Sequence, residues 1–353
     1  MLKNIPGILL ALAIAYIGAE ASKYIGVNIL GFAKSPISSI MLAIIFGIVL
    51  ANSINLPKQC DIGFKFCIKY ILKFGIILLG IRLGLLDILK IGIIGLPVII
   101  VCISAALLIA NYLSKSLNVS TKMGALIAVG TGICGATAIV ATAPAIDAKK
   151  EEVTYAIGVI TVFGIIAMFL YPYLAHYIFK GDELFIGLFL GTSIHETSQV
   201  AAAGLIYDQQ FNSPETLNVA TVTKLIRNTF LVILIPLFAF LYNRGELKGQ
   251  NYSILSIFPY FVIGFIGMIV VRNIGDQFFT PDNNSYNLWI NLIGYLKTLA
   301  TVFLTMAMAA VGISINLSEL KSMGYKPFVV GLIAAITVGF VSLIYIETLT
   351  KFI

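Results

Sequence analysis

Hydrophobic residues in this chain lie in long uncharged blocks separated by short polar connections. Examples are Ile91–Leu113, Met123–Ile146 and Val153–Phe179. A helix needs roughly 20 mostly apolar residues to cross a bilayer. A segment inside the bilayer must also satisfy its own backbone hydrogen bonds, which favours helices. The pattern therefore predicts a polytopic, all-α membrane protein.

We expect about eleven transmembrane helices within a single transporter domain that covers residues 1–353. Residues 5–19 form an extra first span, although the sequence around Ala19–Ala21 would also suit a cleavable signal. The other ten spans divide into residues 37–179 and 184–348. These five-plus-five halves predict an inverted repeat, because inverted copies require an odd number of spans. The predicted spans are residues 5–19, 37–54, 63–82, 91–113, 123–146, 153–179, 184–206, 217–243, 253–271, 288–313 and 327–348.

Composition and charge agree with a membrane protein. Hydrophobic residues make up 59% of the chain and charged residues 11%, against about 25% charged residues in a soluble domain. The net charge of +7 comes from basic residues scattered near span ends, which indicates membrane topology and not nucleic-acid binding. The cysteines form no CxxC pair and are predicted to be buried thiols, with no metal and no cofactor. They are Cys60, Cys67, Cys102 and Cys134.

Small residues dominate the segment Gly130–Ile146, which contains Gly130, Gly132 and Gly135. Each glycine costs about 1 kcal/mol relative to alanine in a helix interior. One explanation is close packing against other helices. The other is a broken helix, whose second half would attract an anion at its N-terminus. On that interpretation the candidate substrate-binding residues are Thr131, Gly132, Cys134, Gly135 and Thr137.

The segment Gly191–Gly204, GTSIHETSQVAAAG, places polar residues inside an apolar block. It is not a zinc motif of the HExxH type, because Gln199 stands where the second histidine is required. A solvated loop between short helices is one explanation, and an unwound segment that lines a transport path is the other. Ionisable groups at membrane depth cost about 2.5–3.5 kcal/mol each and usually mark a pathway, and a histidine can couple transport to protons. The candidates here are Ser193, His195, Glu196, Thr197 and Gln199.

Two basic residues, Lys224 and Arg227, lie near the start of the eighth predicted span. They either anchor the span at the membrane surface or face the bundle interior, where they would bind an anion or pair with Glu196. Lys297, inside the tenth predicted span, has the same two explanations. All three are included as candidate substrate-binding residues.

Four motifs resemble the YeiH-type family of sulfate exporters, in the same order and across nearly the whole chain. This resemblance implies the fold of the bile-acid, arsenite and riboflavin transporter-like superfamily, in which two five-helix inverted repeats cross through broken helices. It further implies breaks at Gly130–Gly135 and around Ala309–Gly312. The motifs are Gly130–Ile139 (GTGICGATAI) with Ala143-Pro144, Gly191–Gly204, Ala220–Arg227 (ATVTKLIR) and Met306–Ile313 (MAMAAVGI).

The function we expect is secondary transport, in the export direction, of a small anion such as sulfate, sulfite or an organosulfonate, by alternating access. The alternative is a cation/proton antiporter that uses Glu196 and His195. No serine nucleophile elbow, aspartate pair or HExxH motif occurs, so we do not expect an enzyme. The expected partners are the lipid bilayer of a bacterial plasma membrane, the anion and a coupling proton or sodium ion. Nucleic acid is not expected, and a homo-oligomer is left open.

Overall fold

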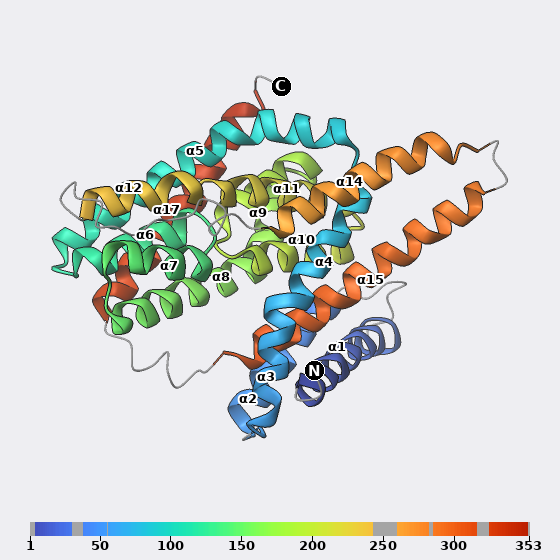
Figure 1. Ribbon diagram of the computed structural model, residues 1–353, viewed down its shortest axis with the longest axis horizontal. Coiled ribbons are helices and arrows are strands. Elements are labelled where there is room, and N and C mark those ends of the chain that lie inside the picture. The colour runs from blue at the N-terminus through green and yellow to red at the C-terminus, as the bar shows by residue number, and fades with distance from the viewer. Residues whose placement is uncertain are drawn as a thin grey trace. The chain divides into compact units, whose positions relative to one another are not determined.

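The computed structural model describes residues 4–29, 38–54, 56–242, 260–281, 285–315 and 325–351, and every regular element in these ranges is a helix (Figure 1). Among these described residues, seven stretches of helix are long and apolar enough to cross a membrane. The all-α membrane class is therefore confirmed, whereas the count of about eleven spans is not. The seven are Ile5–Ile29, Leu85–Ser116, Lys150–Ile178, Pro214–Tyr242, Phe261–Phe278, Tyr286–Ile313 and Tyr325–Leu349.

The start of predicted span 253–271 lies outside the described residues, as does the first residue of span 37–54.

The seven stretches contain most of the long helices. The elements are α1 (Ile5–Lys23) with η2 (Tyr24–Ile29), α5 (Leu85–Ser116), α8 (Lys150–Ile178), α11 (Pro214–Thr229) with α12 (Leu231–Tyr242), α14 (Phe261–Phe278), α15 (Tyr286–Ile313) and α17 (Tyr325–Leu349).

The remaining predicted spans correspond to helices that are short or interrupted. Two of them contain a break at which the helix stops and restarts, and these breaks form the candidate site described below. The elements are α2 (Ser39–Ser53), α3 (Gln59–Phe66), η3 (Cys67–Ile71), α4 (Leu72–Leu79), η4 (Gly80–Arg82), α6 (Thr121–Gly132), α7 (Ala136–Thr142), η5 (Ala143–Ile146), α9 (Glu183–Ser193) and α10 (Thr197–Phe211).

The chain divides into two compact units. Unit 1 comprises Met1–Leu89, Ala201–Asn218 and Tyr260–Lys321, and unit 2 comprises Lys90–Val200, Val219–Pro259 and Ser322–Ile353. The division falls within α5, α10 and α11. Each unit takes segments from both predicted halves of the chain, so the units do not coincide with residues 37–179 and 184–348. The single transporter domain and the inverted repeat stay predictions.

Within unit 1, α15 packs against α1, α2 and α4. Glycines allow the backbones of α2 and α15 to approach closely. A Cβ atom on Gly47 would lie 2.6 Å from the carbonyl oxygen of Ala309, and one on Gly312 would lie 2.3 Å from that of Ile44. The predicted break around Ala309–Gly312 is wrong, because α15 is continuous to Ile313. The small residues there serve helix packing instead.

Within unit 2, α6 packs against α8 and α17, and α9 packs against α8 and α17. Every residue of α6 from Gly124 to Gly132 is buried. Apolar side chains of α5, α6, α7, α8, α12 and α17 form one core around it. The end of α6 therefore lies deep in unit 2, where an unsatisfied backbone group would be costly.

All four cysteines are free and buried, which confirms the prediction of buried thiols.

Candidate functional site

The first helix break lies between α6 and α7, at residues 133–135. Gly135 has φ +68° and ψ −131°, a conformation that side-chain-bearing residues rarely adopt. A Cβ atom at Gly135 would also lie 2.3 Å from Cγ of Glu196. The predicted broken helix is confirmed, with Gly135 as the residue that requires it. Gly130 and Gly132 remain helical within α6.

The second break lies between α9 and α10, at residues 194–196. Ile194 is extended, with φ −86° and ψ 141°. Ser193 and Ile194 are fully buried, and His195 is 1% exposed. The segment is therefore unwound and buried, as predicted, and the alternative of a solvated loop is wrong. Its place on a transport path stays a prediction.

Lys224 of α11 joins the two breaks. Its side chain is fully buried, and its ammonium group donates to the carbonyl oxygens of Ile133 at 2.6 Å and Ile194 at 2.9 Å, and to that of His195. The last carbonyl groups of a helix have no partner within the helix. Lys224 therefore supplies hydrogen-bond donors to buried carbonyl oxygens at both breaks. An ammonium group has three donors. Lys224 therefore contributes positive charge to the site but keeps no donor for a ligand.

Arg227, one turn further along α11, does the same at the ends of α6 and α9. Nε donates to Gly132 O at 2.6 Å, Nη2 to Thr131 O at 2.5 Å and Nη1 to Thr192 O. The planar guanidinium carries five N–H donors. Among the described residues three of them are used, so Arg227 retains donors for a bound anion.

Glu196 directly precedes α10 in the chain, but its carboxylate lies at the N-terminus of α7. Its Oε1 atom accepts from the backbone N–H of Ala136 at 3.3 Å and from the Thr161 hydroxyl at 3.5 Å. Its Oε2 atom accepts from the Ser198 hydroxyl at 3.5 Å. A carboxylate is favourable at a helix N-terminus. The position at which the sequence predicted a substrate anion is thus held by this chain's own carboxylate.

Hydrogen bonds to α8 and α11 fix the first turn of α10. Gln199 Oε1 accepts from the Glu196 backbone N–H at 3.2 Å, and Gln199 Nε2 donates to Thr161 O of α8 at 3.3 Å. Asn228 Nδ2 of α11 donates to Thr197 Oγ1 at 3.0 Å. The start of α10 is therefore held in place from two sides.

His195 is the buried polar side chain that this network leaves unsatisfied. Neither ring nitrogen forms a hydrogen bond of normal geometry within the described residues, although the Thr131 backbone lies close to the ring. Thr131 Oγ1 and Asn228 Oδ1 are also buried without a partner there. An unpaired buried polar group costs about 1–3 kcal/mol. A ligand that hydrogen-bonds to these atoms would remove that cost.

The charges of the site do not cancel. Lys224 and Arg227 are fully buried, and both lie within electrostatic range of His195. Glu196, which is partly exposed, is a carboxylate within electrostatic range of Lys224. Two cations against one carboxylate leave a formal surplus of one positive charge. A buried surplus is costly in the absence of a partner, so the site is suited to an anion.

The structure brings most of the predicted site residues together around the two breaks. Thr137 is an exception, because it is exposed on α7. Lys297 belongs to unit 1 and is described with that unit below. The residues that come together are Thr131, Gly132, Cys134, Gly135, Ser193, His195, Glu196, Thr197, Gln199, Lys224 and Arg227.

Sequence reasoning missed Thr161 and Asn228 as members of the site. Thr161 is one of two threonines in its predicted span, and nothing in the surrounding sequence distinguishes it. Asn228 follows Arg227 directly, so its spacing from Lys224 was a usable signal. Within the described ranges, no group of three or more His, Cys, Asp or Glu residues lies together in a way that could hold a metal ion.

Comparisons with known proteins cover the whole site. A family model described as "Conserved hypothetical protein 698" matches residues 6–331. A UPF0324 membrane protein of Fusobacterium nucleatum is 35% identical over 308 residues, which cover 86% of this chain and 88% of the relative. One from Streptococcus agalactiae is 35% identical over 329 residues, with 93% and 92% covered. One from Streptococcus pneumoniae is 34% identical over 343 residues, with 95% and 94% covered.

Proposed function

Since this chain belongs to the UPF0324 family of membrane proteins, we propose that it is a secondary transporter of a small oxyanion. UPF0324 is the YeiH-type family, so the family expected from the motifs is confirmed. The seven apolar helices among the described residues agree with a multi-pass protein of the cell membrane. The substrate and the mechanism that follow are our proposal.

The observation that carries the proposal is the buried surplus of positive charge between two helix breaks. An oxyanion would meet the remaining N–H donors of Arg227, the imidazole of His195 and the N-terminal turn of α10. An anion with several oxygen atoms around a central sulfur can accept hydrogen bonds from donors that approach from different directions. Sulfate, sulfite and organosulfonates are therefore the substrates we propose, and the direction we propose is export.

We propose that the anion moves by alternating access. Unit 2 contains the complete set of residues that bind the anion, so it can act as the body that carries the substrate. Lys224 and Arg227 tie the two breaks of unit 2 to one helix, which would preserve the site's geometry while unit 2 moves. Broken helices at membrane depth are common at transporter sites, because they expose backbone groups only against protein or cargo.

A cation/proton antiporter is the second candidate, and the presence of Glu196 favours it. The carbonyl oxygens that would coordinate an alkali cation are instead occupied by Lys224 and Arg227. The positive charges of Lys224 and Arg227 stand where an alkali cation would bind. For this reason we place the anion transporter first. We propose no catalytic role, because the charged side chains bind backbone carbonyls and do not align a nucleophile with a base.

A ligand screen on the purified protein in detergent tests the proposal. We expect sulfate, sulfite or a sulfonate to raise the melting temperature in a saturable manner, and sodium or potassium at matched ionic strength to leave it unchanged. The effect should be lost in His195→Leu. If only alkali cations stabilise the protein, and Glu196→Gln abolishes that stabilisation, the antiporter is the correct function.

A further inference from the structure

A second group of charged side chains lies in unit 1 and takes no part in the proposed function. Arg82 ends η4, Arg272 is on α14 and Lys297 is on α15. Arg82 pairs with Asp208, and Arg272 pairs with Asp276. Three cations against two carboxylates leave one positive charge in excess.

Arg82 is poorly satisfied for a buried arginine. Its side chain is 10% exposed, and its ion pair to Asp208 measures 3.5 Å between Nη1 and Oδ2. Good charge-assisted bonds of this type measure about 2.7–2.9 Å. The Nε atom is buried and has no partner among the described residues. Arg82 is therefore a buried guanidinium with an unused Nε donor.

Close packing fixes the position of Arg82. A Cβ atom on Gly80 would lie 2.4 Å from the carbonyl oxygen of Phe265, so η4 and α14 meet backbone to backbone. The residue that precedes Arg82 is part of a small apolar core shared with α15. That core contains Ile81, Trp289 and Ile293, with Met268, Phe279 and Leu296 packed against it.

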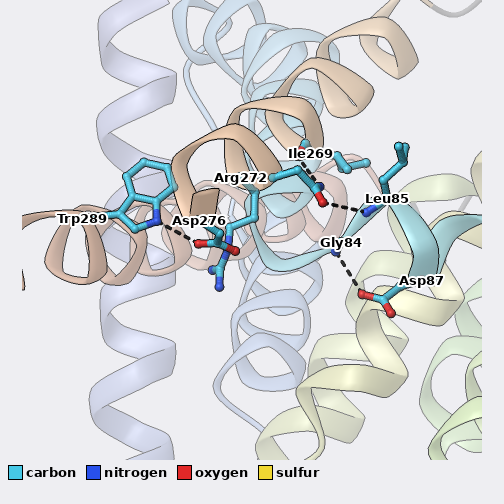
Figure 2. A network of polar contacts seen from close by, with 8 residues as sticks. Gly84, Leu85, Asp87, Ile269, Arg272, Asp276 and Trp289 are labelled. Carbon is cyan, nitrogen blue, oxygen red and sulfur yellow. Dashed lines mark hydrogen bonds and ion pairs between the residues drawn. The ribbon is translucent and has the colours of Figure 1, made fainter. Parts of the chain in front are cut away.

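Asp276 is already committed to other partners. Figure 2 shows its carboxylate between the indole of Trp289 and the side chain of Arg272. Trp289 Nε1 donates to Oδ1 at 2.9 Å, and Arg272 Nε donates to Oδ2 at 2.5 Å. Among the described residues, Asp276 forms an ion pair with Arg272 and none within 4 Å with Arg82 or Lys297.

Lys297 supplies the unpaired charge. It is partly buried, and it forms no ion pair within 4 Å among the described residues. It lies within electrostatic range of Arg82, Arg272 and Asp276. Leu296, which precedes Lys297, packs against the same small core that contains Ile81, which precedes Arg82. Arg82 and Lys297 therefore lie in the same part of unit 1, and both have unused donors.

We propose that Arg82 and Lys297 form a second anion-binding site, with Arg272 as a supporting charge, for a ligand that carries a phosphate- or sulfate-type oxyanion. Arginine offers directed N–H donors and lysine a compact charge, a combination that suits a tetrahedral oxyanion. The oxyanion belongs either to a free ion or to the headgroup of an anionic lipid. The site consists of unit 1 residues alone and does not depend on the helix breaks of unit 2.

The experiment uses the full chain in a neutral detergent and carries His195→Leu throughout, so that binding at the unit 2 site is removed. Melting temperature is followed against sulfate and, separately, against a short-chain phosphatidylglycerol. We expect saturable stabilisation by at least one probe. Lys297→Gln, which leaves both ion pairs intact, should weaken that binding about tenfold. Lys115→Gln, which changes an exposed lysine of α5, is the matched control and should leave the binding unchanged.

Each outcome decides the proposal. Saturation by sulfate that depends on Lys297 identifies a free anion as the ligand, and saturation by the lipid alone identifies a headgroup. Arg82→Gln serves as a second variant and should give the same loss. The absence of saturation with both probes, or equal affinity in Lys297→Gln and Lys115→Gln, would overturn the proposal. Because the background already lacks His195, neither result depends on whether the proposed transport function is correct.

Discussion

Lys224 and Arg227 lie one helical turn apart on α11 and divide the free carbonyl groups of two helix breaks between them. Lys224 holds Ile133, Ile194 and His195, and Arg227 holds carbonyls at the ends of α6 and α9. Helices that stop inside a protein leave acceptors unsatisfied. Lys224 and Arg227 donate hydrogen bonds to these acceptors, and they place positive charge at the two breaks.

Removal of the Lys224 ammonium should destabilise the protein. Lys224→Ala leaves three buried carbonyl oxygens without a donor, and each costs about 1 kcal/mol or more. We expect the melting temperature in detergent to fall by roughly 5–10 °C. Because the side chain leaves a space of its own shape, propylammonium in the buffer should restore part of the loss.

Propanol and Lys115→Ala are the controls for this rescue. Propanol has the shape of the lost side chain but no charge, so it should not restore stability. Lys115→Ala removes an exposed lysine and should neither lower the melting temperature nor respond to propylammonium. An equal fall in both lysine variants would show that the carbonyl contacts of Lys224 contribute nothing.

Gly135→Ala should abolish anion binding. The substitution places a Cβ atom 2.3 Å from Cγ of Glu196 and forces a residue with a side chain into a backbone region that is essentially restricted to glycine, at a cost of about 1–3 kcal/mol. Gly267→Ala on α14 is the matched control, because nothing lies within 4 Å of its added methyl group. That control should be neutral or stabilise the helix by up to about 1 kcal/mol. Binding titrations and melting curves on both variants check the prediction. Wild-type anion affinity in Gly135→Ala would contradict the role of Gly135.

Glu196→Gln should change how anion binding depends on pH. The carboxylate repels an anion when it is ionised and not when it is protonated, so wild-type affinity should rise as the pH falls. The amide of glutamine can still accept from the Ala136 N–H, so the fold is retained. We expect the variant to bind the oxyanion tightly at neutral pH, with a flat pH profile measured by titration. If the affinity of the variant still rises on acidification, as in the wild type, Glu196 is not the cause of the pH dependence of anion binding.

The sequence alone predicted the breaks well where the cause is local. Gly135 needs a backbone conformation that other residues avoid, and the polar groups around His195 are too costly for a plain span. The break around Ala309–Gly312 is implied by the family resemblance and not by local sequence, and it is wrong, since small residues either weaken a helix or allow it to pack closely. Only the neighbour, here Ile44 on α2, decides between these outcomes.

The partners of the charged residues could not be predicted in this way. The sequence offered Lys224 and Arg227 as direct ligands of an anion, whereas they bind mainly backbone carbonyls. Lys297 is a candidate substrate-binding residue by sequence, and the structure places it in unit 1, within electrostatic range of Arg82. A long charged side chain in a span selects its partner from residues that are far away in the sequence.

Flux through proteoliposomes, compared between the wild type and His195→Leu, tests the central claim most directly. His195 is buried without a hydrogen-bond partner of normal geometry, so an apolar residue there should not lower the melting temperature. We predict saturable exchange of labelled sulfate, sulfite or a sulfonate by the wild type. The equally stable variant should show a reduction of about tenfold or more, which corresponds to the loss of about one charge-assisted hydrogen bond. If the wild type exchanges none of these anions, or if His195→Leu exchanges them equally fast, the paired helix breaks are not the transport site.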